Sequence, residues 1–186
     1  EYGLVLTCLG GPNSKLSYKI GPQRIKNNFE EHIKQNDNFD FNPFNPLEGS
    51  NERHFCFPTV NLPFGQFSRT SYKQYDEYHT SLDNIEFTDT SQLLKSAYEI
   101  YEAIVSFEDA FDFDSDFKNE IDTENSQKQF TDGTFYLPNT KYGEPFLSKY
   151  NLYPDINEYG SKRKERESKL DNIIKIITSC DGNTSI

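Results

Sequence analysis

Apolar residues along this chain occur either in short continuous runs or at helical spacing, and each pattern predicts a different element. Residues 3–9 form a run rich in leucine and valine that ends at a Gly-Gly-Pro sequence, which predicts a buried strand and a tight turn. Residues 22–35 carry apolar side chains at helical spacing, with a proline suited to the first turn. Residues 36–50 predict a loop with one short strand, and residues 56–67 predict a strand entering a loop because they contain two prolines.

The clearest predicted helix covers residues 88–107, with Thr88 or Thr90 as its cap. Its apolar residues form one stripe and are Leu93, Leu94, Ala97, Ile100, Tyr101, Ile104 and Val105. A second amphipathic helix is predicted over residues 162–178, with an apolar face made of Leu170, Ile173, Ile174 and Ile177. This order of strands and helices predicts an α/β fold in which helices cover an open mixed sheet.

Composition narrows the classes of protein and partner that fit the pattern. The hydrophobic content of 34% is modest, although 12 Tyr and 16 Phe supply bulky apolar surface. No apolar run approaches the roughly 20 residues that a membrane-spanning helix needs, so a soluble chain without a membrane anchor is predicted. A net charge of −11 argues against non-specific binding of nucleic acid by the chain as a whole.

The cysteines and the acidic residues bear on compartment and on metal binding. Three widely spaced cysteines form no CxxC pair, which favours a reducing cytoplasm over a disulfide framework. Residues 108–130 form an acidic insertion whose alternating aspartates suggest a calcium loop. An EF-hand requires Gly at its sixth position and Glu at its twelfth, and Phe117 and Thr123 stand there instead. A solvated insertion is therefore predicted, made acidic by residues that include Asp112, Asp114 and Asp116.

Candidate chemistry is concentrated around one histidine in the segment Glu77-Tyr78-His79-Thr80-Ser81-Leu82-Asp83-Asn84. His79 is expected between a strand and the long helix, where sites in open α/β sheets gather. A neutral imidazole suits zinc, and Asp83 is near enough in sequence to orient the ring as a hydrogen-bond acceptor. The alternative is that this single histidine has only a structural or surface role.

Several segments, in one order, resemble a group of bacterial proteins that contain a zinc aminopeptidase-like domain. Members of this group often end in a winged-helix segment, and their genes often accompany surface-polysaccharide biosynthesis. The resemblance covers most of the chain outside the acidic insertion. Besides the first strand and the histidine loop, it rests on Gly49-Ser50-Asn51-Glu52-Arg53, Asn61-Leu62-Pro63-Phe64-Gly65, Leu152-Tyr153-Pro154 and Asp181-Gly182.

This resemblance implies a fold and a division of the chain. Residues 1–138 would be the C-terminal part of a zinc-exopeptidase-like three-layer sandwich of the phosphorylase/hydrolase type, with an open mixed sheet. Residues 139–186 would be a linker and the start of a winged-helix-like module. The chain has no Met and begins directly with a strand-like segment, so we expect it to be a fragment of a larger protein.

The broader similarity to zinc exopeptidases with two metal ions implies the ligands. His79 would be the family's last histidine ligand, and Cys8 stands where the family has an acidic ligand at the end of a strand. Cys8 could bind zinc as a thiolate, or it could be a buried apolar cysteine. The remaining ligands and the glutamate that serves as general base would precede Glu1, so this chain alone is expected to be inactive.

The resemblance also implies a substrate pocket, lined by Asn51, Glu52 and Arg53 together with Tyr78 and Thr80. Arg53 could hold a substrate carboxylate through two hydrogen bonds, and the alternative is a surface Glu–Arg pair. The implied function is a zinc-dependent, aminopeptidase-like hydrolase that cleaves an amide bond of a peptide or an amino-sugar conjugate. The alternative is a binding or regulatory module that retains the fold without the chemistry.

Overall fold

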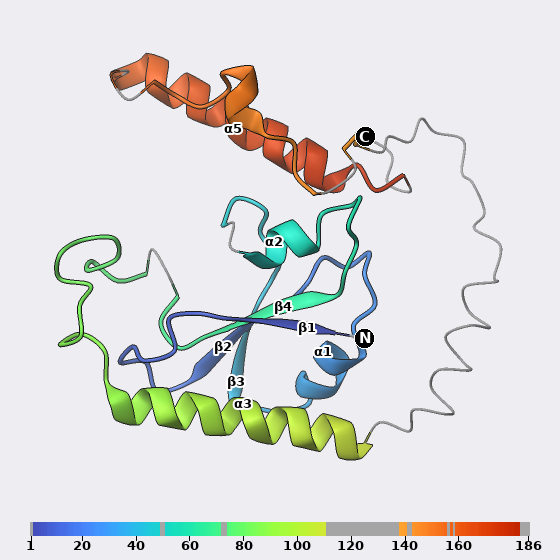
Figure 1. Ribbon diagram of the computed structural model, residues 1–186, viewed down its shortest axis with the longest axis vertical. Helices are drawn as coiled ribbons and strands as arrows, with labels where there is room; N and C mark the ends of the chain where they lie inside the picture. Colours follow the sequence, from blue (N-terminus) through green and yellow to red (C-terminus); the bar gives the residue numbers. More distant parts are fainter. Residues whose placement is uncertain are drawn as a thin grey trace.

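Four short strands form one mixed sheet with helices on both of its faces (Figure 1). The computed structural model describes residues 2–48, 51–71, 74–110, 138–140, 143–155, 157 and 159–182. In chain order the elements are β1 (Gly3–Leu6), β2 (Leu16–Lys19), α1 (Asn28–Ile33), β3 (Phe39–Asn42), α2 (Asn51–Phe55), β4 (Phe64–Ser68), α3 (Thr90–Ala110), the 3-10 helix η1 (Leu147–Tyr150) and α5 (Gly160–Ser179). The predicted α/β class with a mixed sheet is confirmed.

The strand order is β1-β4-β2-β3, and only the central pair, β4 with β2, is antiparallel. Its register sets Tyr18 opposite Phe67 and Lys19 opposite Gln66. Because successive side chains on a strand point to opposite faces, this register gives the sheet an aromatic face and a polar face. Helices α1 and α3 cover the aromatic face, and α2 lies over the polar face (Figure 1).

Phe29 on α1 is the centre of the aromatic core. Its ring stacks on Tyr2 with centroids 4.5 Å apart and meets Phe107 of α3 edge to face at 5.4 Å. A tilted contact with Tyr18 and an edge-to-face contact with Phe67, both on the sheet, complete its surroundings. The buried cluster contains Leu16, Tyr18, Phe29, Ile33, Phe39, Phe67, Ile100, Ala103 and Phe107. Aromatic side chains therefore supply most of the volume of this small core.

The first helix is shorter than predicted, because a turn replaces its expected first half. The N–H of Ile25 donates to the carbonyl of Pro22 across 3.0 Å, which closes the turn. Asn27 then caps α1 by accepting a hydrogen bond from the backbone N–H of Glu30. Asn at this position satisfies a backbone donor that the first turn leaves free, so the helix begins at Asn28 and not at Pro22.

The apolar stripe predicted for the long helix is only partly correct. Ile100 is buried, but Leu94 and Tyr101 are 67% and 59% exposed. The buried positions, spaced three or four residues apart, are Ser96, Ile100, Ala103 and Phe107. Ser96 faces inward because the fully buried guanidinium of Arg69 donates to its hydroxyl across 2.6 Å. A polar contact thus sets the rotation of α3, which a hydrophobic pattern cannot indicate.

The cap of α3 also differs from the prediction. The carboxylate of Asp89 accepts hydrogen bonds from the backbone N–H and the hydroxyl of Ser91, both at 2.7 Å. These bonds lower the pKa of Asp89. Asp89 therefore takes the capping role expected of Thr88 or Thr90.

The C-terminal helix α5 has the predicted apolar face. Leu170 and Ile174 are buried against Leu147 of η1, with Ile173, Ile177, Leu47 and Leu152 packed around them. One helix does not identify a winged-helix module, so that assignment and the boundary at 138/139 stay predictions. Residues 111–137, with most of the acidic insertion and its Asp112, Asp114 and Asp116, lie outside the described residues. Within the described ranges, no helix has both the length and the apolar character needed to cross a bilayer.

Phe29→Ala is expected to lower the free energy of unfolding by about 3–5 kcal/mol, because it removes a buried ring that contacts four others. Tyr101→Ala, which removes an exposed ring of α3, should change it by less than about 0.5 kcal/mol. Urea denaturation followed by circular dichroism measures both. Equal losses in the two variants would show that the core is not centred on Phe29.

Candidate functional site

Cys8 follows β1 at the edge of the sheet where β1 and β4 both end. The two strands are parallel, so the segments that follow them start at the same edge. The Cys8 carbonyl accepts hydrogen bonds from the backbone N–H groups of Arg69 and Thr70, at 3.1 and 3.2 Å. Cys8 has a φ of 49°, which is uncommon for a residue with a side chain. These backbone contacts hold the half-buried thiol at the sheet edge.

Tyr75 joins two of the predicted site residues through its hydroxyl. The Tyr75 hydroxyl donates to Asp83 Oδ2 across 3.3 Å, and Cys8 Sγ lies 3.9 Å from the Tyr75 hydroxyl oxygen. One hydroxyl hydrogen cannot serve both contacts, so the thiol is the donor to Tyr75. Burial, together with neighbouring Cys8 and Asp83, raises the pKa of Tyr75. The phenol therefore stays protonated at neutral pH and keeps its hydrogen bond to Asp83.

His79 lies in the same loop but takes no part in that hydrogen-bonded group. It is exposed, has a φ of 58°, and its ring stacks on Tyr78 with centroids 4.0 Å apart. Tyr78 in turn meets Tyr75 edge to face at 5.7 Å. A row of rings thus connects His79 to the Cys8–Tyr75–Asp83 group, while the imidazole itself faces solvent.

Thr80 is used by the loop itself. Its hydroxyl donates to the Glu77 carbonyl across 2.7 Å and accepts a hydrogen bond from the Leu82 N–H at 3.2 Å. The Asp83 N–H also donates to the Thr80 carbonyl. Thr80 therefore stabilises the turn that carries His79. Its predicted contact with substrate stays a prediction.

Zinc requires three or four donors in a protein site. Among the residues that the structure describes, no group of three or more His, Cys, Asp and Glu side chains is placed to hold a metal ion. Cys8 and Asp83 are both bound to Tyr75, and His79 is exposed beside them. The described residues therefore do not fit a complete zinc centre, and metal binding by His79 and Cys8 stays a prediction.

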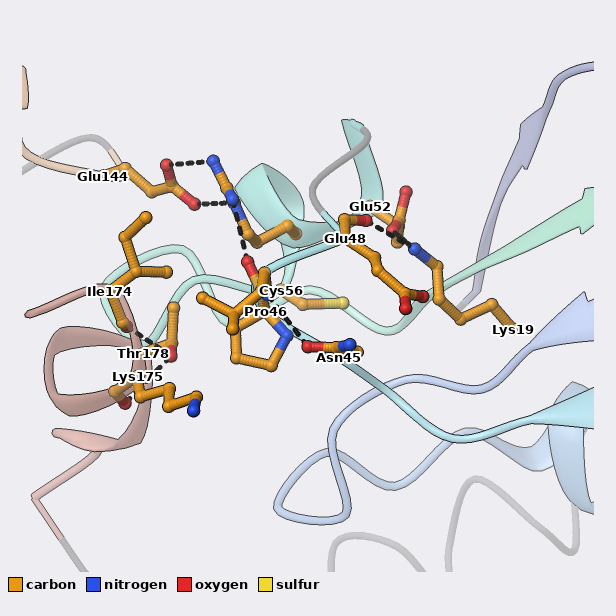
Figure 2. A network of polar contacts seen from close by, with 12 residues as sticks. Lys19, Asn45, Pro46, Glu48, Glu52, Cys56, Glu144, Ile174, Lys175 and Thr178 are labelled. Carbon is orange, nitrogen blue, oxygen red and sulfur yellow. Dashed lines mark hydrogen bonds and ion pairs between the residues drawn. The ribbon is translucent and has the colours of Figure 1, made fainter. Parts of the chain in front are cut away.

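Helix α2 carries the other predicted residues, and it directs neighbouring side chains to different surroundings (Figure 2). The side chain of Glu52 is 1% exposed and forms an ion pair of 2.6 Å with Lys19 Nζ, whose side chain is 7% exposed. Lys19 also donates to the carbonyl of Glu48. This buried pair fixes the rotation of α2 over the polar face of the sheet. Asn51, the first residue of the helix, is exposed.

Arg53 holds a carboxylate, and that carboxylate belongs to the same chain. Its Nη2 donates to Glu144 Oε2 across 2.9 Å, and its Nε forms an ion pair with the other oxygen of Glu144. Its Nη1 donates to the Pro46 carbonyl at 2.8 Å. Arg53 contacts Pro46 and Glu144, whereas the ring of His79 stacks on Tyr78, so a pocket shared by Arg53 and His79 stays a prediction.

Three important residues were not identified from the sequence. Tyr75 carries no motif, because only the fold brings it to Cys8. Lys19 follows buried Tyr18 along β2, and strand alternation puts it on the opposite face of the sheet, where α2 buries it. Glu144 is one of 30 acidic residues, and nothing local distinguishes it as the partner of Arg53.

Lys19→Met should lower the free energy of unfolding by about 3–5 kcal/mol, because it leaves the Glu52 carboxylate buried without its ion pair. The double variant Lys19→Met/Glu52→Leu should recover most of this loss, since no unpaired charge remains. Urea denaturation near pH 7 measures both. If the double variant were as unstable as the single one, a buried charge would not be the cause.

Alkylation at pH 8 should modify Cys8 well before Cys56 and Cys180, because the Cys8 side chain is only half-buried whereas the other two are buried. Burial raises the pKa of Cys56 to about 11, which at pH 8 lowers its thiolate fraction roughly 100-fold relative to an ordinary thiol. Burial also raises the pKa of Cys180. Peptide mapping by mass spectrometry after treatment with iodoacetamide gives the order, and early modification of Cys56 would contradict it.

Two known proteins of Clostridium acetobutylicum are similar to this chain. One carries the provisional name of a polysaccharide biosynthesis protein with an aminopeptidase-like domain. It is 34% identical over 114 residues, which are 58% of this chain and 25% of that protein, so the chain spans about a quarter of its length. The other is a solved structure provisionally named a peptidase, 24% identical, with a TM-score of 0.48 over 95% of this chain and 39% of that one. This second similarity is too distant to carry a functional assignment.

The model of the domain of unknown function DUF4910 matches residues 1–110. This match covers every strand of the sheet and the helices α1, α2 and α3. It also includes Cys8, Arg53, Tyr75 and His79. The chain therefore belongs to the DUF4910 family.

Proposed function

We propose that this chain is part of an aminopeptidase-like hydrolase that cleaves an amide bond in a peptide or an amino-sugar conjugate. The observation that carries the proposal is the meeting of Cys8, Tyr75 and Asp83 at the edge where β1 and β4 end, next to the exposed His79. Sites in open α/β sheets lie at such edges. The relative with an aminopeptidase-like domain supports the same class of reaction.

The roles of the chain's own residues follow from their contacts. The protonated Tyr75 holds Asp83 and so fixes the loop, and stacking on Tyr78 leaves the imidazole of His79 open to solvent. An exposed neutral imidazole can bind a metal ion or a ligand. We include zinc in the proposal, with His79 and Cys8 as donors. Its further donors would have to come from outside the described residues.

A second candidate function is a binding module that keeps the fold without hydrolysis. Two observations favour it: the described residues lack a complete group of metal donors, and the Arg53 guanidinium already holds Glu144. Metal content separates the two candidates, because a binding module has no requirement for zinc. We also propose a reducing, cytoplasmic compartment for either function, since all three cysteines are free thiols.

His79→Ala should weaken metal binding by the complete gene product that contains this sequence by on the order of 100-fold or more, because it removes a direct ligand. Titration with Co²⁺, followed by its visible absorption, measures the affinity. Hydrolysis of an aminoacyl p-nitroanilide before and after chelation gives the activity. His32→Ala is the matched control, since His32 lies on α1 and its Nε2 is 3.0 Å from the Ser106 hydroxyl of α3, outside both proposed sites.

The outcomes of that titration separate the two candidates. Metal binding and turnover that depend on His79 support the hydrolase. A gene product with neither metal nor turnover would favour the binding module. Unchanged affinity of the His79→Ala variant in an active, metal-containing protein would show that the ligand is elsewhere. The 186-residue chain alone should bind zinc only weakly, since its described residues hold no complete site.

A further inference from the structure

The guanidinium of Arg53 is arranged in advance to receive one carboxylate. Its Nη1 is held by the Pro46 carbonyl at 2.8 Å, so the Nε and Nη2 atoms remain for a second partner. This edge binds both oxygens of Glu144. The two partners are partly buried, with 22% and 18% of their side chains exposed, so solvent screens the pair less than it screens a surface pair. One hydrogen bond and one ion-pair contact to the two oxygens of the same group suit a planar carboxylate.

The scaffold beneath Arg53 is rigid. The Glu52 carboxylate is anchored to Lys19 of β2 through the buried ion pair, and the Lys19 side chain also reaches the Glu48 carbonyl. Helix α2 can therefore not rotate without leaving charge unpaired in the interior. Arg53 follows Glu52 directly in the sequence, so its direction is fixed by the same pair.

The segment that reaches Arg53 has the features of a docked peptide. Gly143 has a φ of 84° and lies so close to His54 that a Cβ atom there would be 2.7 Å from the imidazole Cε1. Glu144 supplies the carboxylate. Three residues later, Leu147 is buried in the cluster formed with Leu170 and Ile174. A glycine for close approach, a carboxylate and an apolar anchor thus follow one another along five residues.

We propose that α2 carries a binding site for a carboxylate-bearing peptide, and that residues 143–147 of the chain occupy this site in cis. A ligand of this class would offer an unbranched backbone against His54 and one carboxylate to Arg53. This site deepens the proposed hydrolase function, because Arg53 is the residue expected to hold a substrate carboxylate. A segment tethered to the same chain has an effective concentration near the millimolar range, so it excludes a free peptide present at micromolar concentration.

The test uses the full 186-residue chain and a fluorescein-labelled peptide of residues 138–150. Fluorescence polarisation should show at least tenfold tighter binding of the peptide to the Glu144→Gln chain than to the unchanged chain, since the internal competitor is lost. Adding Leu147→Ala, which removes the second anchor, should increase this difference. The same peptide with Gln at position 144 should not bind either variant.

Glu165→Gln is the matched control, because it removes an exposed carboxylate whose partner is Lys169, on α5 itself. It should bind the peptide as weakly as the unchanged chain does. Arg53→Gln in the Glu144→Gln background should abolish the gain. Circular dichroism establishes that each variant is folded. If either double variant does not fold, the comparison of the single Glu144→Gln chain with the unchanged chain decides the result.

Tighter binding that depends on both Arg53 and the peptide carboxylate supports the site. A folded Glu144→Gln chain that binds the peptide no better than the unchanged chain overturns it, as does binding that persists with the Gln peptide. The assay requires neither metal nor turnover. Its failure would leave the His79 results of the hydrolase standing, and failure of those results would leave the peptide site standing.

Discussion

The antiparallel pairing of β2 with β4 is the contact on which the other contacts depend. Its register places Tyr18 beside Phe67 and Lys19 beside Gln66, so the two sides of the sheet have opposite character. A slip of one residue would send the lysine into the aromatic core and the tyrosine under α2. Helices α1 and α3 pack on the aromatic side around Phe29, and α2 is bound to the polar side by the ion pair between Lys19 and Glu52.

The ion pair between Lys19 and Glu52 fixes the position of α2 on the sheet. A buried lysine and a buried glutamate tolerate little movement, since separating them would leave a charge in a medium that solvates it poorly. The next residue after Glu52 is therefore presented in one direction, where it meets Pro46 and Glu144. The domain defined by the family match and the segment that ends in α5 are joined at this point, supported by the apolar contact of Leu47 with the α5 cluster.

At the C-terminal end of β4, loops and not helices hold the side chains of the candidate site in place. The backbone after β4 donates to the Cys8 carbonyl, and the tyrosine that follows connects the thiol to Asp83. Two residues with side chains, Cys8 and His79, take positive φ values in this region. Such conformations cost energy and persist where surrounding contacts hold them, so their presence beside a candidate site is consistent with a functional loop.

Local features of the sequence were sufficient for much of the fold. Short apolar runs and helical periods predicted the α/β class, the long helix and the apolar face of α5, because buried positions of each element are occupied by apolar residues. The same patterns gave wrong answers where a polar contact prevailed over hydrophobicity. Capping by Asn27 starts α1 later than predicted, and the hydrogen bond from Arg69 places Ser96 of α3 in the core.

The candidate site was likewise predicted in part from the sequence. Its residue types could be proposed from short segments, since imidazole, thiol and guanidinium groups carry their chemistry with them. Their partners could not be proposed, because Tyr75 is 67 residues from Cys8 and Glu144 is 91 residues from Arg53 along the chain. A sequence records which groups are available. Only the tertiary structure decided which of them meet, since a hydrogen bond depends on distances of about 3 Å that no local pattern encodes.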